Sequence, residues 1–276
     1  MSTTERFPQT GLNLFRLDGK IALVTGAAGS LGRAAALGLA RAGAEVFLTD
    51  RLSPEETTAA LEAEGARAAF WPGDVTLLGD VEQIFDHFDA EFDHLDILIN
   101  NAGINPRQGR AEDYSLDVWD AVLRTNLTSY LMFAQAAARR MLQRRRPGSI
   151  INITSIASST ALGRGNLGFG VSKAGVDQLT RELAIEWANR DIRVNAIQPC
   201  QFLSEGMRDW MSDPTTEATW RRMLEGIPMG RMGEPEEIVG AILFLASAAS
   251  SMVTGIVMPV DGGNLALNPG GTVPSL

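Results

Sequence analysis

The sequence predicts an α/β fold in which about seven parallel strands form one doubly wound sheet with helices on both faces. Short, strand-like runs of β-branched and aliphatic residues alternate with longer segments of helical periodicity along nearly the whole chain. These runs are almost continuously apolar, which is typical of parallel strands that are buried on both faces. Glycine-rich and polar motifs follow several of the runs, at the carboxyl ends of the strands, where ligands bind in such sheets.

The strands and helices are expected in strict alternation, beginning with a strand over 20–26 that ends at Gly26. A helix follows over 30–44, where periodic apolar residues lead to a stop signal at Gly43. The later strands are expected over 45–50, 66–74, 95–103, 148–155, 192–199 and 255–263. The later helices are expected from Ser53 and Pro54 onward and over 77–92, 115–142, 168–188 and 235–247.

One domain accounts for most of the chain, because the sequence has no internal repeat and no linker-like stretch. Residues 1–17 are expected to form an N-terminal arm, and residues 264–276 are expected to form a C-terminal tail. The α/β domain is expected to occupy residues 18–263 between them.

Composition and charge restrict the classes of function. The net charge of −9 and the isoelectric point of about 4.8 argue against a nucleic acid as partner. The single cysteine, Cys200, rules out an internal disulfide and fits a reducing compartment. No apolar run is long enough to span a bilayer, and the first residues lack an apolar signal core. These observations predict a cytoplasmic protein without membrane or nucleic-acid partners.

A glycine-rich loop over 25–32 joins the first strand to the first helix, and this position predicts a dinucleotide site. Glycines let the backbone approach a pyrophosphate at a helix N-terminus. Asp50 closes the second strand 24 residues after Gly26, near the spacing expected for a carboxylate that binds the adenosine ribose. Such a carboxylate accepts hydrogen bonds from both ribose hydroxyls and repels a 2′-phosphate, which favours NAD over NADP. Arg51 follows directly and is able to receive a phosphate, so NADP stays the less favoured alternative.

With these motifs, residues 18–263 resemble the single-domain enzymes of the short-chain dehydrogenase/reductase family. The resemblance implies a Rossmann-like fold and hydride transfer between a nicotinamide cofactor and a secondary alcohol or ketone. Gly26 and Gly32 match the family's glycine motif, TGxxxGxG, while Ser30 stands at its middle glycine. The cofactor-binding residues expected from the loop and from the resemblance together are Thr25, Gly26, Ser30, Leu31, Gly32, Asp50, Arg51, Asp74, Val75, Asn101, Ala102, Gly103, Lys173, Pro199, Cys200 and Ser204.

The resemblance also implies an active site, from which one expected side chain is missing. Ser155 stands at the catalytic serine, Asn126 at the helix asparagine that holds a proton-relay water, and Lys173 at the lysine that binds the nicotinamide ribose. The family places a tyrosine four residues before this lysine, one helical turn away, but here the position is Phe169. A phenylalanine has no proton to give to a carbonyl oxygen, so the sequence lacks the family's general acid.

Neither of the chain's two tyrosines, Tyr114 and Tyr130, is placed as a convincing replacement, and Tyr130 is expected to pack between helices or subunits. Three interpretations of Phe169 therefore stay open. Phe169 is an engineered change that silences a dehydrogenase, or it is natural and Ser155 relays the proton with a water bound to Lys173. In the third interpretation, the protein is a catalytically silent sensor or scaffold that binds the cofactor without turnover.

The substrate pocket is expected between the loop after the fourth strand, the segment before Phe169, and a region over 200–228 that resembles the family's mobile lid. Ser155 and Phe169 are expected to line this pocket. Arg107 and Arg164 are candidates to hold a carboxylate or a hydroxyl-rich substrate. The stretch NNAGINPR is similar to that of gluconate 5-dehydrogenases and related polyol enzymes, which implies a polyol or a sugar acid as substrate.

The remaining expectations concern metals and assembly. The two histidines, His87 and His94, are expected on a solvated helix end, and no metal site is predicted. The helices at 115–143 and 166–189 carry apolar residues on more than one face, and the resemblance implies that they pair across two-fold axes. A homotetramer or a homodimer is therefore expected, with a small-molecule substrate as the further partner.

Overall fold

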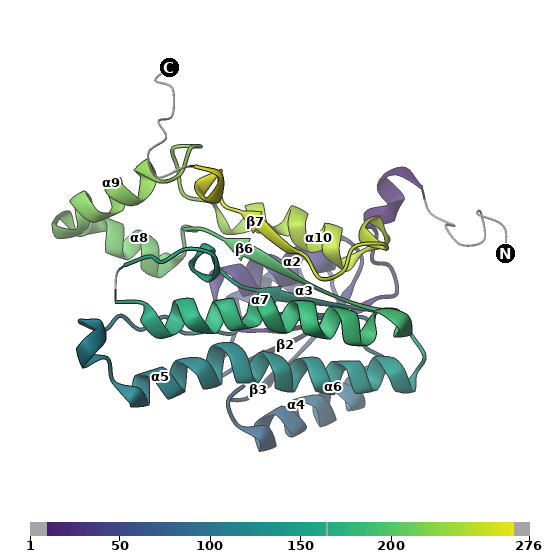
Figure 1. Ribbon diagram of the computed structural model, residues 1–276. Helices are drawn as coiled ribbons and strands as arrows, with labels where there is room; N and C mark the ends of the chain where they lie inside the picture. Colours follow the sequence, from purple (N-terminus) through teal and green to yellow (C-terminus); the bar gives the residue numbers. More distant parts are fainter. Residues whose placement is uncertain (1–9, 164, 268–276) are drawn as a thin grey trace.

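The structure is a computed structural model that describes residues 10–163 and 165–267, and it places a parallel sheet between two layers of helices (Figure 1). Within the described residues the sheet has seven strands in the order β3-β2-β1-β4-β5-β6-β7, and all neighbouring strands are parallel. The strands are β1 (Ile21–Thr25), β2 (Glu45–Asp50), β3 (Ala68–Pro72), β4 (Ile97–Asn100), β5 (Gly148–Ile153), β6 (Ile192–Pro199) and β7 (Val257–Val260). Strand order reverses between β1 and β4, so their carboxyl ends form a topological switch point. The predicted doubly wound sheet is confirmed.

The helices cover both faces of the sheet and enclose two apolar cores (Figure 1). Leu23 of β1 belongs to the core that contains Phe85 of α4, whereas the neighbouring Val24 belongs to the core that contains Leu39 of α2. This alternation follows from the two-residue period of a strand. The helices are α2 (Ser30–Arg41), α3 (Glu55–Ala63), α4 (Leu78–Glu91), α5 (Leu116–Leu123), α6 (Ser129–Gln143), α7 (Leu167–Trp187), α8 (Glu205–Ser212), α9 (Glu217–Glu225) and α10 (Val239–Ala246).

Two of the predicted helices are not continuous. The helix expected over 115–142 is divided into α5 and α6 by a π-helical turn, Arg124–Thr128. A π turn inserts one extra residue into the helix, and such turns are frequent at functional sites. The helix expected over 235–247 begins as a 3₁₀ turn, Pro235–Ile238, before α10. The expected helix stop at Gly43 is present, with a φ of +105° that favours glycine.

The described ends of the chain belong in part to the folded domain. Of the predicted arm, residues 1–9 lie outside the described residues, and Gly11–Phe15 forms a 3₁₀ turn. Leu17 is 1% exposed and lies in the core with α2, because its N–H donates to the Ala42 carbonyl at 2.8 Å. The segment predicted as a lid contains α8 and α9. Of the predicted tail, residues 268–276 lie outside the described residues.

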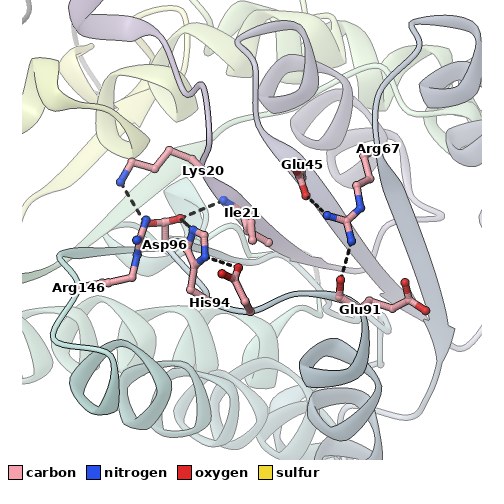
Figure 2. A network of polar contacts seen from close by, with 9 residues as sticks. Lys20, Ile21, Glu45, Arg67, Glu91, His94, Asp96 and Arg146 are labelled. Carbon is pink, nitrogen blue, oxygen red and sulfur yellow. Dashed lines mark hydrogen bonds and ion pairs between the residues drawn. The ribbon is translucent and has the colours of Figure 1, made fainter.

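A buried carboxylate joins the amino ends of β1 and β4, at the edge of the sheet opposite the carboxyl ends (Figure 2). The Asp96 side chain is 2% exposed and accepts hydrogen bonds from Lys20 Nζ at 3.0 Å and from the Ile21 N–H at 3.1 Å. Arg146 Nη2 donates to the same carboxylate at 3.2 Å. Two cations and a backbone donor compensate the burial of this charge, so we interpret the cluster as structural.

His94 lies next to this carboxylate and not on a solvated helix end. Its side chain is 15% exposed, and its Nε2 lies 3.0 Å from Asp96 (Figure 2). The expectation of solvent exposure for His94 is therefore wrong. His87 stacks on the ring of Trp71, with 3.1 Å between the ring centroids. Among residues 10–163 and 165–267, no helix combines the length and the apolar character that a membrane crossing requires.

Candidate active site

A cavity of about 720 Å³ lies at the carboxyl ends of the strands, and its volume is typical of a ligand site. It brings together side chains from the loops after β1, β2, β3, β4, β5 and β6. The predicted site residues that line it are Gly26, Ser30, Leu31, Asp50, Arg51, Asp74, Val75, Asn101, Ala102, Gly103, Arg107, Ser155, Phe169, Cys200 and Ser204. The predicted site residues that do not line it are Thr25, Gly32, Asn126, Lys173 and Pro199. Arg164 lies outside the described residues.

The glycine loop at the start of α2 packs too closely on its neighbours for side chains at Gly26 and Gly32. Gly26 has a φ of +68°, and a Cβ at this position would lie only 2.8 Å from Asn101 Nδ2. A Cβ on Gly32 would lie 2.1 Å from the Gly26 carbonyl oxygen, so glycine lets the helix pack closely on the loop. Ser30, the first residue of α2, lines the cavity. The backbone N–H groups of the first helical turn are free of helical partners and fit an anionic group here.

Thr25 and Asn101 hold the carboxyl ends of β1 and β4 together behind this loop. Thr25 Oγ1 accepts hydrogen bonds from the N–H groups of Asn101 at 2.9 Å and Ala102 at 3.1 Å. Asn101 Nδ2 donates to the carbonyl oxygens of Thr25 and Gly26, both at 3.0 Å. Thr25 is 2% exposed, so it shapes the cavity wall without facing the cavity.

The carboxylate of Asp50 lies at the end of the cavity where adenosine is expected. Its Oδ2 accepts from the Ala28 N–H at 3.0 Å, and its Oδ1 accepts from the Leu52 N–H at 3.1 Å. Each carboxylate oxygen has two acceptor sites, so one on each oxygen stays available to a ribose hydroxyl. The guanidinium of Arg51, 66% exposed, lies 3.8 Å from Asp74.

Asp74 is held in its charged form beside this end of the cavity. Burial alone would raise the pKa of Asp74, but hydrogen bonds from Thr76 and the charge of Arg51 outweigh burial, so the pKa lies below its ordinary value. Arg124 Nε donates to the Thr76 carbonyl at 2.8 Å. Sequence reasoning did not single out Thr76, Arg124 or Thr125, although all three line the cavity. Thr76 lies two residues after Asp74, and Arg124 and Thr125 directly precede Asn126, so closeness in sequence to predicted site residues could have indicated them.

Ser155 and Phe169 both line the cavity, at the end where chemistry is expected. Ser155 follows β5 by two residues, and its Oγ accepts from the Ala157 N–H at 3.2 Å. The hydroxyl hydrogen remains available as a donor. Phe169 lies in the first turn of α7 and presents a half-buried ring to the same cavity. The cavity thus has one serine hydroxyl at this end and an apolar ring where the family's phenol is expected.

Lys173 lies one turn beyond Phe169 but behind the cavity wall. It is 4% exposed, and its Nζ donates to the Ile153 carbonyl at 2.7 Å and to Tyr130 Oη at 3.0 Å. Burial lowers the pKa of Lys173 to about 7, although the charge of Asp177 acts in the opposite direction. Burial therefore makes the neutral amine easier to form than in an exposed lysine.

Tyr130 is buried beside Lys173, which sequence reasoning did not foresee. It is 1% exposed, and its hydroxyl donates to the Ile153 carbonyl at 3.0 Å. Burial raises the pKa of this phenol above its ordinary value, so the phenol is neutral at physiological pH. Because Tyr130 does not line the cavity, it is not a substitute for the missing tyrosine in contact with substrate.

Asn126 is fully buried in the π-helical turn, and its side chain joins three segments of the site. Oδ1 accepts from the Ile104 N–H at 2.8 Å, and Nδ2 donates to the Ile104 carbonyl at 2.9 Å. Nδ2 also donates to Ser172 Oγ at 3.1 Å. Both amide hydrogens are thus used to tie the loop after β4 to α7. The predicted role of Asn126 in holding a water stays a prediction.

Polar side chains surround the far end of the cavity, where substrate is expected. Arg107 lines the cavity, and its guanidinium lies 5.5 Å from the ring centroid of Trp210 in α8. Asn166 Nδ2 donates to Asn105 Oδ1, and both residues line the cavity. This pair leaves one amide hydrogen on Asn166 and two on Asn105 for further partners. Met207 of α8 closes the same end of the cavity.

The loop after β6 contributes a protonated thiol and a helix cap. Cys200 lines the cavity, and burial, assisted by the charge of Asp261, raises the pKa of its thiol to about 11. A protonated thiol of this kind is a poor nucleophile. Ser204 Oγ accepts from the Met207 N–H at 3.2 Å at the start of α8. Among residues 10–163 and 165–267, no group of three His, Cys, Asp or Glu side chains is arranged for a metal ion.

Comparisons with known proteins match nearly the whole chain. A family model described as enoyl-(acyl carrier protein) reductase matches residues 26–264. The chain is 38% identical over 255 residues to 2-dehydro-3-deoxy-D-gluconate 5-dehydrogenase of Escherichia coli K12, covering 92% of this chain and 99% of that protein. It is 38% identical over 252 residues to D-threitol dehydrogenase of Mycolicibacterium smegmatis, covering 90% of this chain and 94% of that protein.

A solved structure extends the same similarity to three dimensions. Gluconate 5-dehydrogenase from Burkholderia cenocepacia, in complex with NADP and tartrate, superposes with a TM-score of 0.84 at 37% sequence identity. The alignment covers 93% of this chain and 99% of that chain. Dehydrogenases named for a sugar acid or a polyol therefore share this fold over almost its full length.

Proposed function

The chain belongs to the short-chain dehydrogenase/reductase family, and on this basis we propose that it interconverts a secondary alcohol and a ketone with a nicotinamide cofactor. The observation that carries the proposal is the single cavity that joins the N-terminus of α2 and Asp50 at one end to Ser155 and Arg107 at the other. We expect a dinucleotide at the first end, because the free backbone N–H groups at the start of α2 suit an anionic group there.

NAD is the cofactor that we propose. Asp50 supports it, since a carboxylate at the end of β2 accepts from two ribose hydroxyls and repels a 2′-phosphate. The NADP bound to the Burkholderia gluconate 5-dehydrogenase makes NADP the alternative, and here the exposed Arg51 would receive the extra phosphate. The cofactor, when bound, supplies or accepts the hydride.

We propose that Ser155 and Lys173 share the work of the missing tyrosine. The Ser155 hydroxyl faces the cavity and donates a hydrogen bond to the substrate oxygen. Lys173 supplies the proton through a water, because its pKa of about 7 is close to the working pH of a general acid. Nζ lies next to Gly103, which lines the cavity, so a thin wall separates the amine from the substrate end. The Phe169 ring contributes an apolar surface that excludes bulk water.

A polyol or a sugar acid is the substrate class that we propose. The guanidinium of Arg107 supports a carboxylate, which it would bind by charge-assisted hydrogen bonds. The amide groups of Asn105 and Asn166 support a hydroxyl-rich chain, because both residues line the cavity and keep unused hydrogens after bonding to each other. The names of the relatives, a deoxygluconate dehydrogenase and a threitol dehydrogenase, agree with this class.

A silent cofactor-binding protein is the second candidate, and one observation favours it. Lys173 is bonded to Tyr130 and to the Ile153 carbonyl and does not line the cavity. If the lysine stays in this position when cofactor binds, its amine does not reach the substrate, and Ser155 is left to supply the proton. Such a protein would bind the dinucleotide and sense its level without turnover.

The test is a substrate panel followed by the absorbance of reduced nicotinamide. Gluconate and glucitol are compared as a pair, because they differ chiefly in the carboxylate that Arg107 would bind. Each is measured with NAD and with NADP, and binding of both dinucleotides is measured by calorimetry. Turnover of gluconate with NAD supports the proposal, and turnover with NADP alone refutes the cofactor assignment. Binding without turnover of any polyol or sugar acid supports the silent protein.

We further propose a homodimer or homotetramer that uses α5 and α7. Leu116 of α5 is 75% exposed and Ile185 of α7 is 80% exposed, and the two helices lie side by side on one face of the molecule (Figure 1). Leu167 and Val171 of α7 are each 45% exposed. Apolar side chains gathered on one surface favour association. Light scattering at micromolar concentration tests the proposal, and a monomeric mass refutes it.

A further inference from the structure

Three polar groups form a closed triangle behind the cavity, one from each of three elements. Lys173 Nζ of α7 donates to the Ile153 carbonyl of β5 at 2.7 Å and to Tyr130 Oη of α6 at 3.0 Å. Tyr130 Oη in turn donates to the same Ile153 carbonyl at 3.0 Å. Both side chains are buried, at 4% exposure for the lysine and 1% for the tyrosine.

We propose that Tyr130 is a positioning residue that holds the Lys173 amine at the end of β5 and sets how readily this amine carries a proton. The effect of Tyr130 on catalysis rests on the proposed function, in which Lys173 supplies the proton. The contact between Tyr130 and Lys173 does not depend on that function. In this chain the tyrosine hydroxyl that contacts the lysine thus comes from α6, since Phe169 of α7 has none.

The groups around the amine explain why this one contact matters. From its own helix, the carboxylate of Asp177 acts on Lys173, and the Phe169 ring centroid lies 5.9 Å from Nζ. From α6, the Tyr130 ring centroid lies 4.7 Å away and its phenol is neutral. From β5 and the loop after β4, the described neighbours are a backbone carbonyl and Gly103. Two acceptors therefore stabilise the buried ammonium, and the Tyr130 hydroxyl is one of them.

Removal of this hydroxyl has a defined effect on the amine. A hydrogen bond to the charged form of a group favours that form, so its loss favours the neutral form. The variant Tyr130→Phe keeps the ring and its packing but loses the acceptor. The midpoint of Lys173 titration is then expected to fall by about one pH unit, since a hydrogen bond to a charged group has this order of strength.

The chain offers an unusually direct assay, because Lys20 and Lys173 are its only two lysines. Protein labelled with ¹³Cε-lysine gives two ε-methylene signals, and the variant Lys20→Arg assigns them. The Lys173 signal is followed against pH in the unaltered protein, in Tyr130→Phe and in Tyr114→Phe. Tyr114 is the matched control, because among the described residues its buried hydroxyl has no hydrogen-bond partner. The expected result is a lower midpoint in Tyr130→Phe and an unchanged midpoint in Tyr114→Phe.

An equal midpoint in Tyr130→Phe and in the unaltered protein would overturn the inference, and so would an upward shift. A second measurement keeps it testable if the variant does not fold. In the unaltered protein, the Lys173 ε-methylene is expected to show nuclear Overhauser effects to the Tyr130 ring, and their absence would contradict the contact.

The same samples separate this inference from the proposed function. If Lys173 is the general acid, the pH profile of kcat moves with the NMR midpoint in Tyr130→Phe, while KM for substrate changes little. If the midpoint moves and the profile does not, Tyr130 still positions Lys173, but the proposed catalytic role of the lysine fails. If no sample turns over, the NMR titration alone decides the inference.

Discussion

The substitution Phe169→Tyr adds to the cavity a hydroxyl at the position where the resemblance implies a catalytic tyrosine. The Phe169 ring is half-buried and lines the cavity, so a hydroxyl at its para position would reach the cavity without being buried unpaired. Ser155 lines the same cavity and is able to hydrogen-bond the new phenol. Lys173 Nζ lies 5.9 Å from the ring centroid, where its positive charge lowers the pKa of a nearby phenol.

The expected increase in kcat depends on how well Ser155 and Lys173 are placed to assist the new phenol. A positioned general acid contributes about 10²–10⁴-fold to the rate, which is about 3–5 kcal/mol of activation free energy. The amine of Lys173 is held by the Ile153 carbonyl and Tyr130, and burial lowers its pKa to about 7, which disfavours its charged form. Both features weaken its effect on a new phenol. We therefore expect the lower part of that range, an increase in kcat of about 100-fold.

The assay compares initial rates of nicotinamide reduction at saturating cofactor for the unaltered protein and for Phe169→Tyr. Phe169→Leu is the matched control, because it changes the ring without adding a hydroxyl and is expected to give no increase. Ser155→Ala combined with Phe169→Tyr is expected to lose most of the gain. A rate for Phe169→Tyr equal to or below that of the unaltered protein, with dinucleotide binding intact, would refute this account of the site.

Three further predictions concern cofactor choice, pH and stability. Asp50→Asn removes the charge that repels a 2′-phosphate. The ratio of kcat/KM for NADP to kcat/KM for NAD is therefore expected to rise by about tenfold. An unchanged ratio would show that Asp50 does not select the cofactor. The pKa of Lys173 is about 7 in the folded protein and ordinarily 10.5, so between these pH values the unfolded chain binds more protons and folding stability rises with pH. The melting temperature of the unaltered protein, measured relative to that of Lys173→Met, is expected to increase from pH 7 to about pH 9, and a constant difference would contradict the lowered pKa. Asp96→Ala leaves Lys20 and Arg146 without their buried partner. This variant is expected to lower the free energy of unfolding, measured by urea titration, by about 2–3 kcal/mol. Asp93→Ala is the control and is expected to have little effect, because the Asp93 side chain is 82% exposed.

Much of the fold was predictable because its signals are local. Periodic apolar residues define helices and strands over short windows, and a parallel sheet follows from their alternation. The break between α5 and α6 was not predictable in the same way. Asn126 in this π-helical turn bonds to Ile104, which lies 22 residues away in sequence, so tertiary packing brings the two together.

In the candidate site too, some features were predictable from local sequence and others depend on tertiary contacts. Gly26, Asp50 and Ser155 were predictable because each is fixed by the strand it follows, and the carboxyl ends of adjacent parallel strands meet at one edge. Asp50 also shows the limit of that reasoning, because its bonds to the N–H groups of Ala28 and Leu52 are visible only in the structure.

The sequence by itself determined the α/β architecture, the position of Gly26 and Asp50 at the cavity and the absence of a hydroxyl at Phe169, because these depend on residue type, spacing and strand order. Only the tertiary structure decided what surrounds Lys173. Tyr130 lies 43 residues away from Lys173, and their helices pack on the same face of the sheet, so no local pattern marks the contact. Burial by that packing lowers the pKa of the amine, because desolvation depends on every neighbouring element and not on the sequence around the lysine.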